Sequence, residues 1–112
     1  MNNIKGIGVD LVDLSRLDLS HRHFIERLLT PKELEIFDLK ATEQQKREYL
    51  GGRFAVKEAV LKAIGTGLGG MAFHDIEVLN KESGEPYLNI PNALVSISHD
   101  GNMAIAFVVI EN

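Results

Sequence analysis

Residues 42–64 form the longest stretch with helical spacing of apolar residues, and four glycines follow within residues 65–70. Projected at 100° per residue, residues 53–64 are apolar on nearly every side, which is typical of a helix covered by other elements. Glu58 and Lys62 nevertheless lie one turn apart in the middle of this stretch. The sequence therefore predicts a buried helix that carries two charged groups.

The Glu58–Lys62 spacing has two interpretations. On an exposed helix, such a pair forms an ion pair that contributes about 0.2–0.5 kcal/mol. Here apolar residues flank both groups, and removing a charge from water is unfavourable unless a partner or ligand compensates it. We therefore favour a functional site, with Glu58 as a ligand of a cation and Lys62 facing an anion; the ion pair is the alternative.

The glycine run also has two interpretations. A phosphate-binding P-loop follows a strand and precedes a helix, whose N-terminus attracts anions. Residues 65–70 instead follow a helix, where the dipole has the opposite sign, and Gly-x-Lys-Ser/Thr is absent. A P-loop is excluded, and we expect a left-handed glycine to end the helix. A nest of backbone N–H groups for an anion is still compatible with the sequence.

The first forty residues predict one strand and two helices. Alternation over residues 4–14 predicts a strand in which Gly6 and Gly8 mark a bend or a close backbone approach. Residues 20–29 have the pattern of a short amphipathic helix. The sequence Thr-Pro-Lys-Glu at residues 30–33 is a helix start with a capping box.

After the glycines the period changes to two. Residues 73–79 and 86–90 predict one hairpin, and residues 95–99 and 103–110 a second one around Asp100-Gly101. The last of these strands has no polar residue, so we expect it to be buried on both faces or to lie in a subunit contact. The order of the elements predicts an α+β fold with an antiparallel sheet over residues 1–112, read as a single domain.

Composition limits the possible functions. The 112 residues include no cysteine, which excludes a disulfide scaffold, a thiolate metal site and a cysteine nucleophile. The net charge of −4 argues against a nucleic-acid binder, and no apolar run is long enough to span a membrane. We expect a cytoplasmic protein. Residues 16–32 nevertheless carry a local excess of positive charge, which suggests an acidic partner or, alternatively, a solvated helix face.

Three stretches together carry a family resemblance. GIGVDLVDLSR near the start, GRFAVKEAVLKAIGTG in the middle and SISHD before the last strand resemble the bacterial holo-acyl-carrier-protein synthase type of 4′-phosphopantetheinyl transferase. Their order and spacing match along nearly the whole chain. Two segments, between Arg16 and Phe24 and between Tyr87 and Ser96, are shorter than is usual in the family.

The resemblance implies transfer of phosphopantetheine from coenzyme A to a serine of an apo acyl carrier protein, with release of 3′,5′-ADP, in fatty acid biosynthesis. It also implies the 4′-phosphopantetheinyl transferase fold and a homotrimer with its sites at subunit interfaces. Asp10 and Glu58 would be Mg²⁺ ligands, a role suited to hard oxygen donors that share the ion with phosphate and water.

The remaining site residues also follow from the resemblance. Lys62 and His99 would contact the pyrophosphate, and Lys62 with the metal would neutralise the charge that develops on the leaving oxygen. Glu58 would accept the serine proton, directly or through water. The rest of the coenzyme would contact Arg53, Gly65, Thr66 and Gly67, and the acidic carrier would dock on Arg16, Arg22 and Arg27.

Two other functions are compatible with the same residues. A binding module could retain affinity for coenzyme A or the carrier without turnover, although the intact set of Asp10, Glu58 and Lys62 speaks against it. A Mg²⁺-dependent phosphodiester hydrolase would release free phosphopantetheine without a carrier. Taken alone, Asp10 is more typical of a turn or cap, and His99 of a structural residue at a strand end.

Overall fold

The computed structural model of the chain describes residues 3–65 and 71–112. Within these residues, the elements in chain order are β1 (Ile4–Asp13), the 3-10 helix η1 (Leu14–Arg16), α1 (Arg22–Leu28), α2 (Pro31–Leu39), α3 (Glu43–Ile64), the 3-10 helix η3 (Phe73–Asp75), β2 (Val78–Asn80), β3 (Pro86–Leu88), β4 (Ala93–Asp100) and β5 (Met103–Glu111). The α+β class predicted from the sequence is confirmed.

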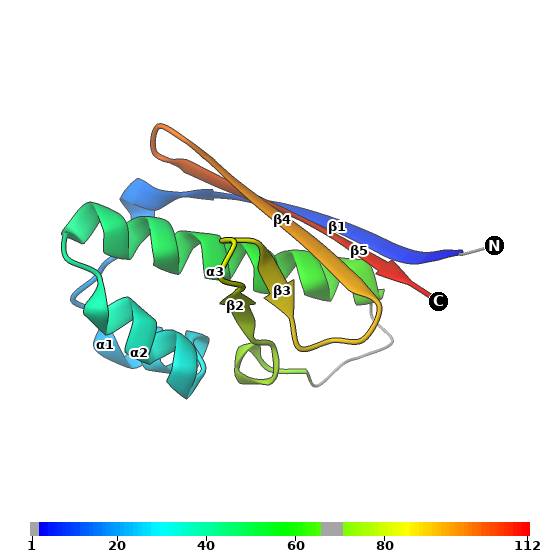
Figure 1. Ribbon diagram of the computed structural model, residues 1–112. Coiled ribbons are helices and arrows are strands. Elements are labelled where there is room, and N and C mark those ends of the chain that lie inside the picture. Colours follow the sequence, from blue (N-terminus) through cyan, green and yellow to red (C-terminus); the bar gives the residue numbers. More distant parts are fainter. Residues whose placement is uncertain (1–2, 66–70) are drawn as a thin grey trace.

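An antiparallel sheet of order β1-β5-β4 covers one side of the long helix α3, and α1 and α2 lie on the other (Figure 1). The small β2–β3 hairpin lies beside α3, with β3 next to the edge strand β4. The predicted capping box is present at Thr30 with Glu33, and the structure shows a second one, not predicted, at Thr42 with Gln45. The predicted long helix therefore begins and ends where expected, and most of its second half is buried.

The two glycines of β1 allow the strand to lie directly on the helix. A Cβ added to Gly6 would be 1.8 Å from the carbonyl oxygen of Ala63, and one added to Gly8 would be 1.9 Å from that of Ala59. No side chain fits at these distances. The close backbone approach predicted for these glycines is confirmed, and it places β1 against the second half of α3.

The hairpin predicted over residues 73–79 and 86–90 is only partly correct. Residues 73–75 form η3 rather than strand, and pairing is confined to Val78–Asn80 with Pro86–Leu88. Side chains hold the turn: Asp75 accepts from the N–H of Ala72, and Asn89 donates to the carbonyl oxygen of Asp75. The bond within residues 72–75 is local and the bond from Asn89 is tertiary; both compete with strand pairing, so the strand begins later than the alternation suggests.

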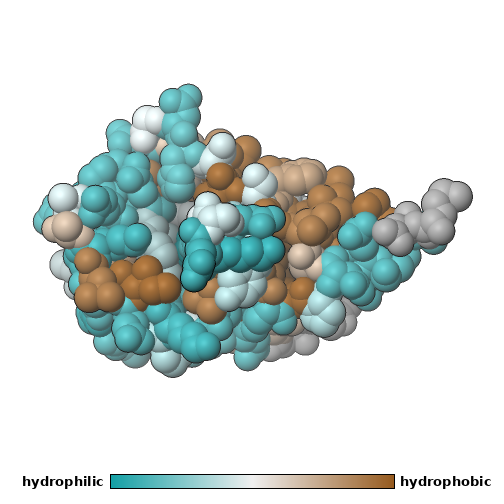
Figure 2. Space-filling model, in the orientation of Figure 1, coloured by the Kyte–Doolittle hydropathy of each residue, from teal (hydrophilic) through white to brown (hydrophobic). Residues whose placement is uncertain are grey.

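One face of the sheet is apolar and exposed. Ala104, Ala106, Val108 and Ile110 of β5 are buried against the rest of the chain, but Ile105 and Phe107 on the other face are 40% and 46% exposed. The expectation that β5 is buried on both faces is therefore wrong for the single chain. The other expectation, that its outer face lies in a contact between subunits, is still compatible with the structure. Figure 2 shows hydrophobic residues gathered where the sheet lies. The exposed outer face comprises Ile7, Val9 and Leu11 of β1, Leu94 of β4, and Ile105 and Phe107 of β5.

Within the described residues, no helix combines the length and apolar character needed to cross a bilayer.

Candidate functional site

Asp10 lies on the face of β1 that packs on α3. It shares this face with Gly8 and Val12, as the alternation of a strand requires. Its side chain is 18% exposed, and its Oδ1 accepts a hydrogen bond from Lys62 Nζ at 3.0 Å. Lys62 Nζ also donates to the carbonyl oxygen of Val9 at 3.0 Å. The amine thus links the end of α3 to β1 beside the Asp10 carboxylate.

Glu58 is half-buried on α3 and lines the same cleft as Asp10. This cleft, which we call the Asp10–Glu58 cleft, has a volume of about 470 Å³. Within residues 3–65 and 71–112, Lys62 pairs with Asp10 rather than with Glu58. The side chain of Lys62 is 55% exposed, so the expectation that both charges are partly buried holds for Glu58 alone. The other residues that line this cleft are Leu11, Val12, Asp13, Arg16, Leu17, Asp18, His21, Phe24 and Phe54.

Two cleft carboxylates, Asp13 and Asp18, are occupied by local hydrogen bonds. Asp13 accepts from Ser15 Oγ at 2.7 Å and Asp18 from Ser20 Oγ at 2.6 Å. These bonds lower the pKa of both carboxyl groups below the ordinary value. Both carboxylates thus bond to residues two positions further along the chain, whereas Asp10 bonds to Lys62 of α3. We therefore take Asp10 and Glu58 as the candidate ligands of a bound cation.

A two-carboxylate site of this kind suits Mg²⁺. No cluster of three or more His, Cys, Asp or Glu residues that could hold a metal occurs in the part of the chain that the structure describes. Mg²⁺ commonly binds through one or two carboxylates and completes its shell with water and substrate phosphate. Asp10 and Glu58 fit this requirement, because both are hard oxygen donors that face one cleft.

His99 and Arg53 line a different cleft, of about 930 Å³, between α2, α3 and the β2–β3 hairpin. We call it the hairpin cleft. The Nε2 atom of His99 lies 3.1 Å from the carbonyl oxygen of Glu48, and the ring also faces Gly52 on α3. The remaining residues that line the cleft are Lys32, Glu35, Ile36, Leu39, Lys40, Gln45, Glu48, Tyr49, Leu79, Asn80 and Tyr87.

Arg53 is held rigidly at the base of the hairpin cleft. Its side chain is buried, its guanidinium lies 4.2 Å from the ring centroid of Tyr49, and an Nη2 proton is donated to Asn80 Oδ1. Arg53 Nε and Tyr49 Oη are buried and lack a partner among the described residues. Burial raises the pKa of the Tyr49 hydroxyl. The guanidinium of Arg53 is thus fixed in place before a ligand binds, and part of its hydrogen-bonding potential is unused among the described residues.

Helix α3 separates the two clefts. Asp10 and His99 both face α3, but Asp10 lies on β1 and His99 on β4. These are the two edge strands of the sheet, and their axes are roughly 10 Å apart. His99 meets the helix at Gly52, whereas Lys62 is ten residues further along, a rise of about 15 Å. One pyrophosphate therefore cannot contact Lys62 and His99 of the same copy of the chain.

The glycine run is described only at its first residue. Gly65 follows α3 with φ 74° and ψ −166°, and its N–H donates to the carbonyl oxygen of Leu61. A positive-φ glycine thus ends the helix, as predicted, although its ψ lies outside the left-handed helical region. Thr66 and Gly67, predicted to bind the coenzyme, lie outside the described residues.

The three arginines of the basic segment have different surroundings. Arg16 is 87% exposed at the Asp10–Glu58 cleft, and among the described residues its one ionic contact is a long one to Asp13. Arg22 is engaged by both carboxylate oxygens of Asp38 and by Glu26, and these bonds lower the pKa of Asp38. Arg27 is exposed and lines a third, more apolar cleft with Phe24, Leu28, Leu61, Met71, Ala72, Phe73 and His74. Arg16 and Arg27 are thus the less restrained cations.

Lys57, a fully buried charge on α3, is a residue that the sequence did not predict to matter. Its side chain is fully buried and pairs with Glu33, which is equally buried, at 2.6 Å. Glu33 was recognised only as a helix cap. The available signal was Lys57 itself, a cation that follows Val56 and lies one turn from Val60 on a helix that is apolar nearly all round.

The chain resembles known proteins over nearly its whole length. The family model described as 4′-phosphopantetheinyl transferase superfamily matches residues 6–108. A holo-[acyl-carrier-protein] synthase of Enterococcus faecalis is 48% identical over 97% of this chain and 98% of its own length. A holo-(acyl-carrier-protein) synthase from Bacillus anthracis, solved in complex with CoA (3′,5′-ADP), superposes with a TM-score of 0.88 at 40% identity, covering 97% of both chains. The synthase of Helicobacter pylori, solved with coenzyme A, gives 0.77 at 30% identity, with 95% and 99% covered.

Proposed function

Because the chain belongs to the 4′-phosphopantetheinyl transferase superfamily, we propose that Asp10, Glu58 and Lys62 are the residues with which it modifies an acyl carrier protein. The chain transfers phosphopantetheine from coenzyme A to an apo acyl carrier protein. The observation that carries the assignment of these residues is that Asp10 and Glu58, on different elements, line one cleft and that Lys62 is bonded to Asp10. A cytoplasmic location is part of the proposal.

The reaction forms a bond between the carrier serine oxygen and the phosphorus of phosphopantetheine and breaks the bond from that phosphorus to 3′,5′-ADP. Mg²⁺ held by Asp10 and Glu58 would supply positive charge at the phosphates. Lys62 reaches the same place on a long, exposed side chain, so its amine neutralises negative charge on the leaving oxygen. Glu58, half-buried in the cleft, accepts the serine proton.

A complete site requires two copies of the chain. Lys62 beside Asp10 and His99 in the hairpin cleft are too far apart in one copy to share a pyrophosphate. We infer that His99 and Arg53 of one copy hold the coenzyme whose pyrophosphate lies at Asp10, Glu58 and Lys62 of the next. The exposed apolar outer face of the sheet supports a contact between copies, and a closed ring of three gives each copy one such neighbour on either side.

The activity is tested by mass spectrometry. Apo carrier protein, coenzyme A and Mg²⁺ are incubated with the chain, and the carrier is expected to gain one phosphopantetheine. Asp10→Asn should stop the gain, whereas Asp13→Asn, a matched change on the same strand that still accepts from the Ser15 N–H, should not. An unmodified carrier across several carrier proteins refutes transfer, and free phosphopantetheine in the absence of a carrier indicates a hydrolase instead.

The shared site is tested by mixing two inactive variants. Asp10→Ala and His99→Ala each damage every site of their own oligomer. After subunit exchange in an equal mixture, about a quarter of the sites combine an intact Asp10 with an intact His99 from a neighbour, so about a quarter of the activity should return. If the mixture stays inactive although mixed oligomers form, Asp10 and His99 do not belong to sites shared between copies.

A further inference from the structure

The buried lysine of α3 makes a complete set of hydrogen bonds. Lys57 Nζ donates to Glu33 Oε1 at 2.6 Å, to the carbonyl oxygen of Leu28 at 2.7 Å and to that of Phe73 at 3.0 Å. An ammonium group has three N–H donors, and all three are used. Burying a charge is unfavourable unless such a set compensates it. Lys57 therefore fixes three segments at one point.

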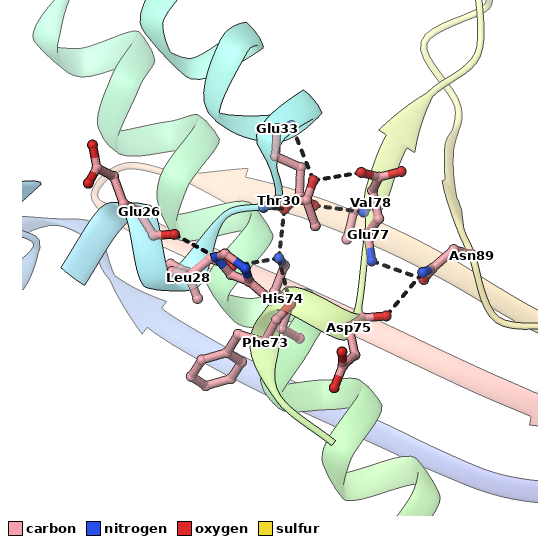
Figure 3. A network of polar contacts seen from close by, with 11 residues as sticks. Glu26, Leu28, Thr30, Glu33, Phe73, His74, Asp75, Glu77, Val78 and Asn89 are labelled. Atoms are coloured by element: carbon pink, nitrogen blue, oxygen red, sulfur yellow. Dashed lines mark hydrogen bonds and ion pairs between the residues drawn. The ribbon is translucent and has the colours of Figure 1, made fainter. Parts of the chain in front are cut away.

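Its partner Glu33 is bound equally completely. Glu33 Oε1 also accepts from the N–H of Thr30, and Oε2 accepts from the N–H of Val78 at 2.7 Å. Figure 3 shows how these bonds continue through neighbouring side chains, where Thr30 donates to Glu77 and His74 contacts the carbonyl oxygen of Glu26. The network joins the end of α1, the start of α2, α3, η3 and β2.

Two of the segments that Lys57 holds, α1 and η3, carry phenylalanine rings that line the Asp10–Glu58 cleft or the apolar cleft beside it. Phe24 of α1, Phe54 of α3 and Phe73 of η3 form an edge-to-face row with centroid distances of 6.0 and 5.9 Å. Lys57 binds the backbone of Phe73 itself and that of Leu28, one turn after Phe24 on α1. Phe24 lines both the Asp10–Glu58 cleft and the apolar cleft beside η3, so the row separates the two.

The position of the row indicates which substrate it contacts. On the proposed function, coenzyme A enters from the hairpin cleft of a neighbouring copy, at the Lys62 side of the Asp10–Glu58 cleft. The opposite side, formed by Phe24, Phe54 and the exposed Arg16, is left for the carrier segment that brings the serine. Arg27 beside the row adds a second exposed cation toward an acidic carrier.

We propose that Lys57 is a positioning residue for the acyl carrier protein. By donating to the carbonyl oxygens of Leu28 and Phe73, it fixes the rings of Phe24 and Phe73 against Phe54, and the carrier binds to this row of rings. This inference rests on the proposed function and adds a residue to it. Lys57 touches neither substrate, so its loss acts on the carrier through the aromatic row and leaves the chemistry at Asp10 and Glu58 in place.

The test compares steady-state kinetics with each substrate varied in turn. Lys57→Met removes the three hydrogen bonds but leaves Glu33 charged and unpaired. The double variant Lys57→Met with Glu33→Gln removes both charges, and the glutamine Oε1 can still accept from the N–H of Thr30, as Gln45 Oε1 accepts from the N–H of Thr42. In the folded double variant the KM for carrier is expected to rise about tenfold, within the usual range for coupling through packed networks, with the KM for coenzyme A and kcat nearly unchanged.

A core variant provides the matched control. Val108→Ala removes buried volume on β5, away from the aromatic row, and should lower stability without a selective rise in the KM for carrier. Equal KM increases for both substrates, or the same carrier effect in Val108→Ala, would mean that Lys57 is merely structural. An unchanged carrier KM in the double variant overturns the proposal as well. Absence of transfer by the unaltered chain is a separate result, which refutes the proposed function.

Discussion

Replacing Gly8 with alanine tests whether the contact between β1 and α3 sets the geometry of the site. The added Cβ would be 1.9 Å from the carbonyl oxygen of Ala59, whereas ordinary contacts begin at 3.4 Å. The obstacle is helix backbone, which cannot rotate away as a flexible side chain could. Strand and helix must therefore separate locally by up to about 1.5 Å, the difference between these two distances.

This separation falls between the two proposed metal ligands. Ala59 directly follows Glu58, and Asp10 lies two residues beyond Gly8 on the same face of β1. A displacement of about 1 Å can lower an enzymatic rate about 100-fold, so kcat/KM should fall by about that factor. Overpacking of this kind is also expected to reduce the free energy of unfolding by about 1–3 kcal/mol.

The assay measures initial rates of carrier modification at a temperature at which circular dichroism shows the variant folded, together with urea unfolding. Gly52→Ala is the matched glycine control for stability: its Cβ would be 3.5 Å from the nearest atom, an ordinary contact, and alanine in a helix interior should raise stability by roughly 0.5–1 kcal/mol. If folded Gly8→Ala has the kcat/KM of the unaltered chain, the β1–α3 contact does not set the site geometry.

Three further outcomes are expected. Thr30→Ala loses the cap to the N–H of Glu33 and the bond to Glu77, so urea unfolding should show a loss of about 1–2 kcal/mol; no loss would mean that the cap is dispensable. Burial raises the pKa of the Tyr49 hydroxyl and so favours its neutral form in the folded chain. The stability that depends on neutral Tyr49 is therefore fully present below about pH 10 and is lost as the pH rises through the folded-state pKa. The difference in tyrosinate absorbance between the unaltered chain and Tyr49→Phe reports on Tyr49 alone, and it should titrate above about pH 10. A midpoint below about pH 10 would contradict burial as the cause of the shift in pKa. Phe107→Lys places a charge on the exposed outer face of the sheet and should convert the proposed trimer to smaller species in sedimentation equilibrium, whereas an unchanged mass would place the contact elsewhere.

Local signals predicted most of the secondary structure. The capping box at Thr30, the positive-φ glycine after Ile64 and the turn at Asp100-Gly101 each depend on residues a few positions apart. Such local interactions are the same wherever the segment lies in the fold. The exception at residues 73–75 has a tertiary cause in part, because the side chain of the distant Asn89 and the amine of Lys57 bind the carbonyl oxygens of that turn.

For the candidate site, the sequence supplied the residue types and the resemblance supplied their roles. Asp10 and Glu58 were identified as a pair from the resemblance, since nothing in their spacing shows that β1 crosses α3 beside Glu58. The buried ion pair of Lys57 and Glu33 was not predicted, because two charges far apart in the chain do not reveal that they meet in the interior.

The sequence by itself determined where most of the helices and strands lie, apart from residues 73–75, and which polar residues interrupt apolar segments. Only the tertiary structure decided that Lys62 bonds to Asp10, that His99 meets α3 at Gly52, far from Lys62, and that the buried cations of the helix are Arg53 and Lys57. The reason is that capping and alternation are short-range, whereas burial and pairing of charges depend on which distant segments pack together. The packing here depends on two glycines of β1 that let a strand lie on the backbone of a helix.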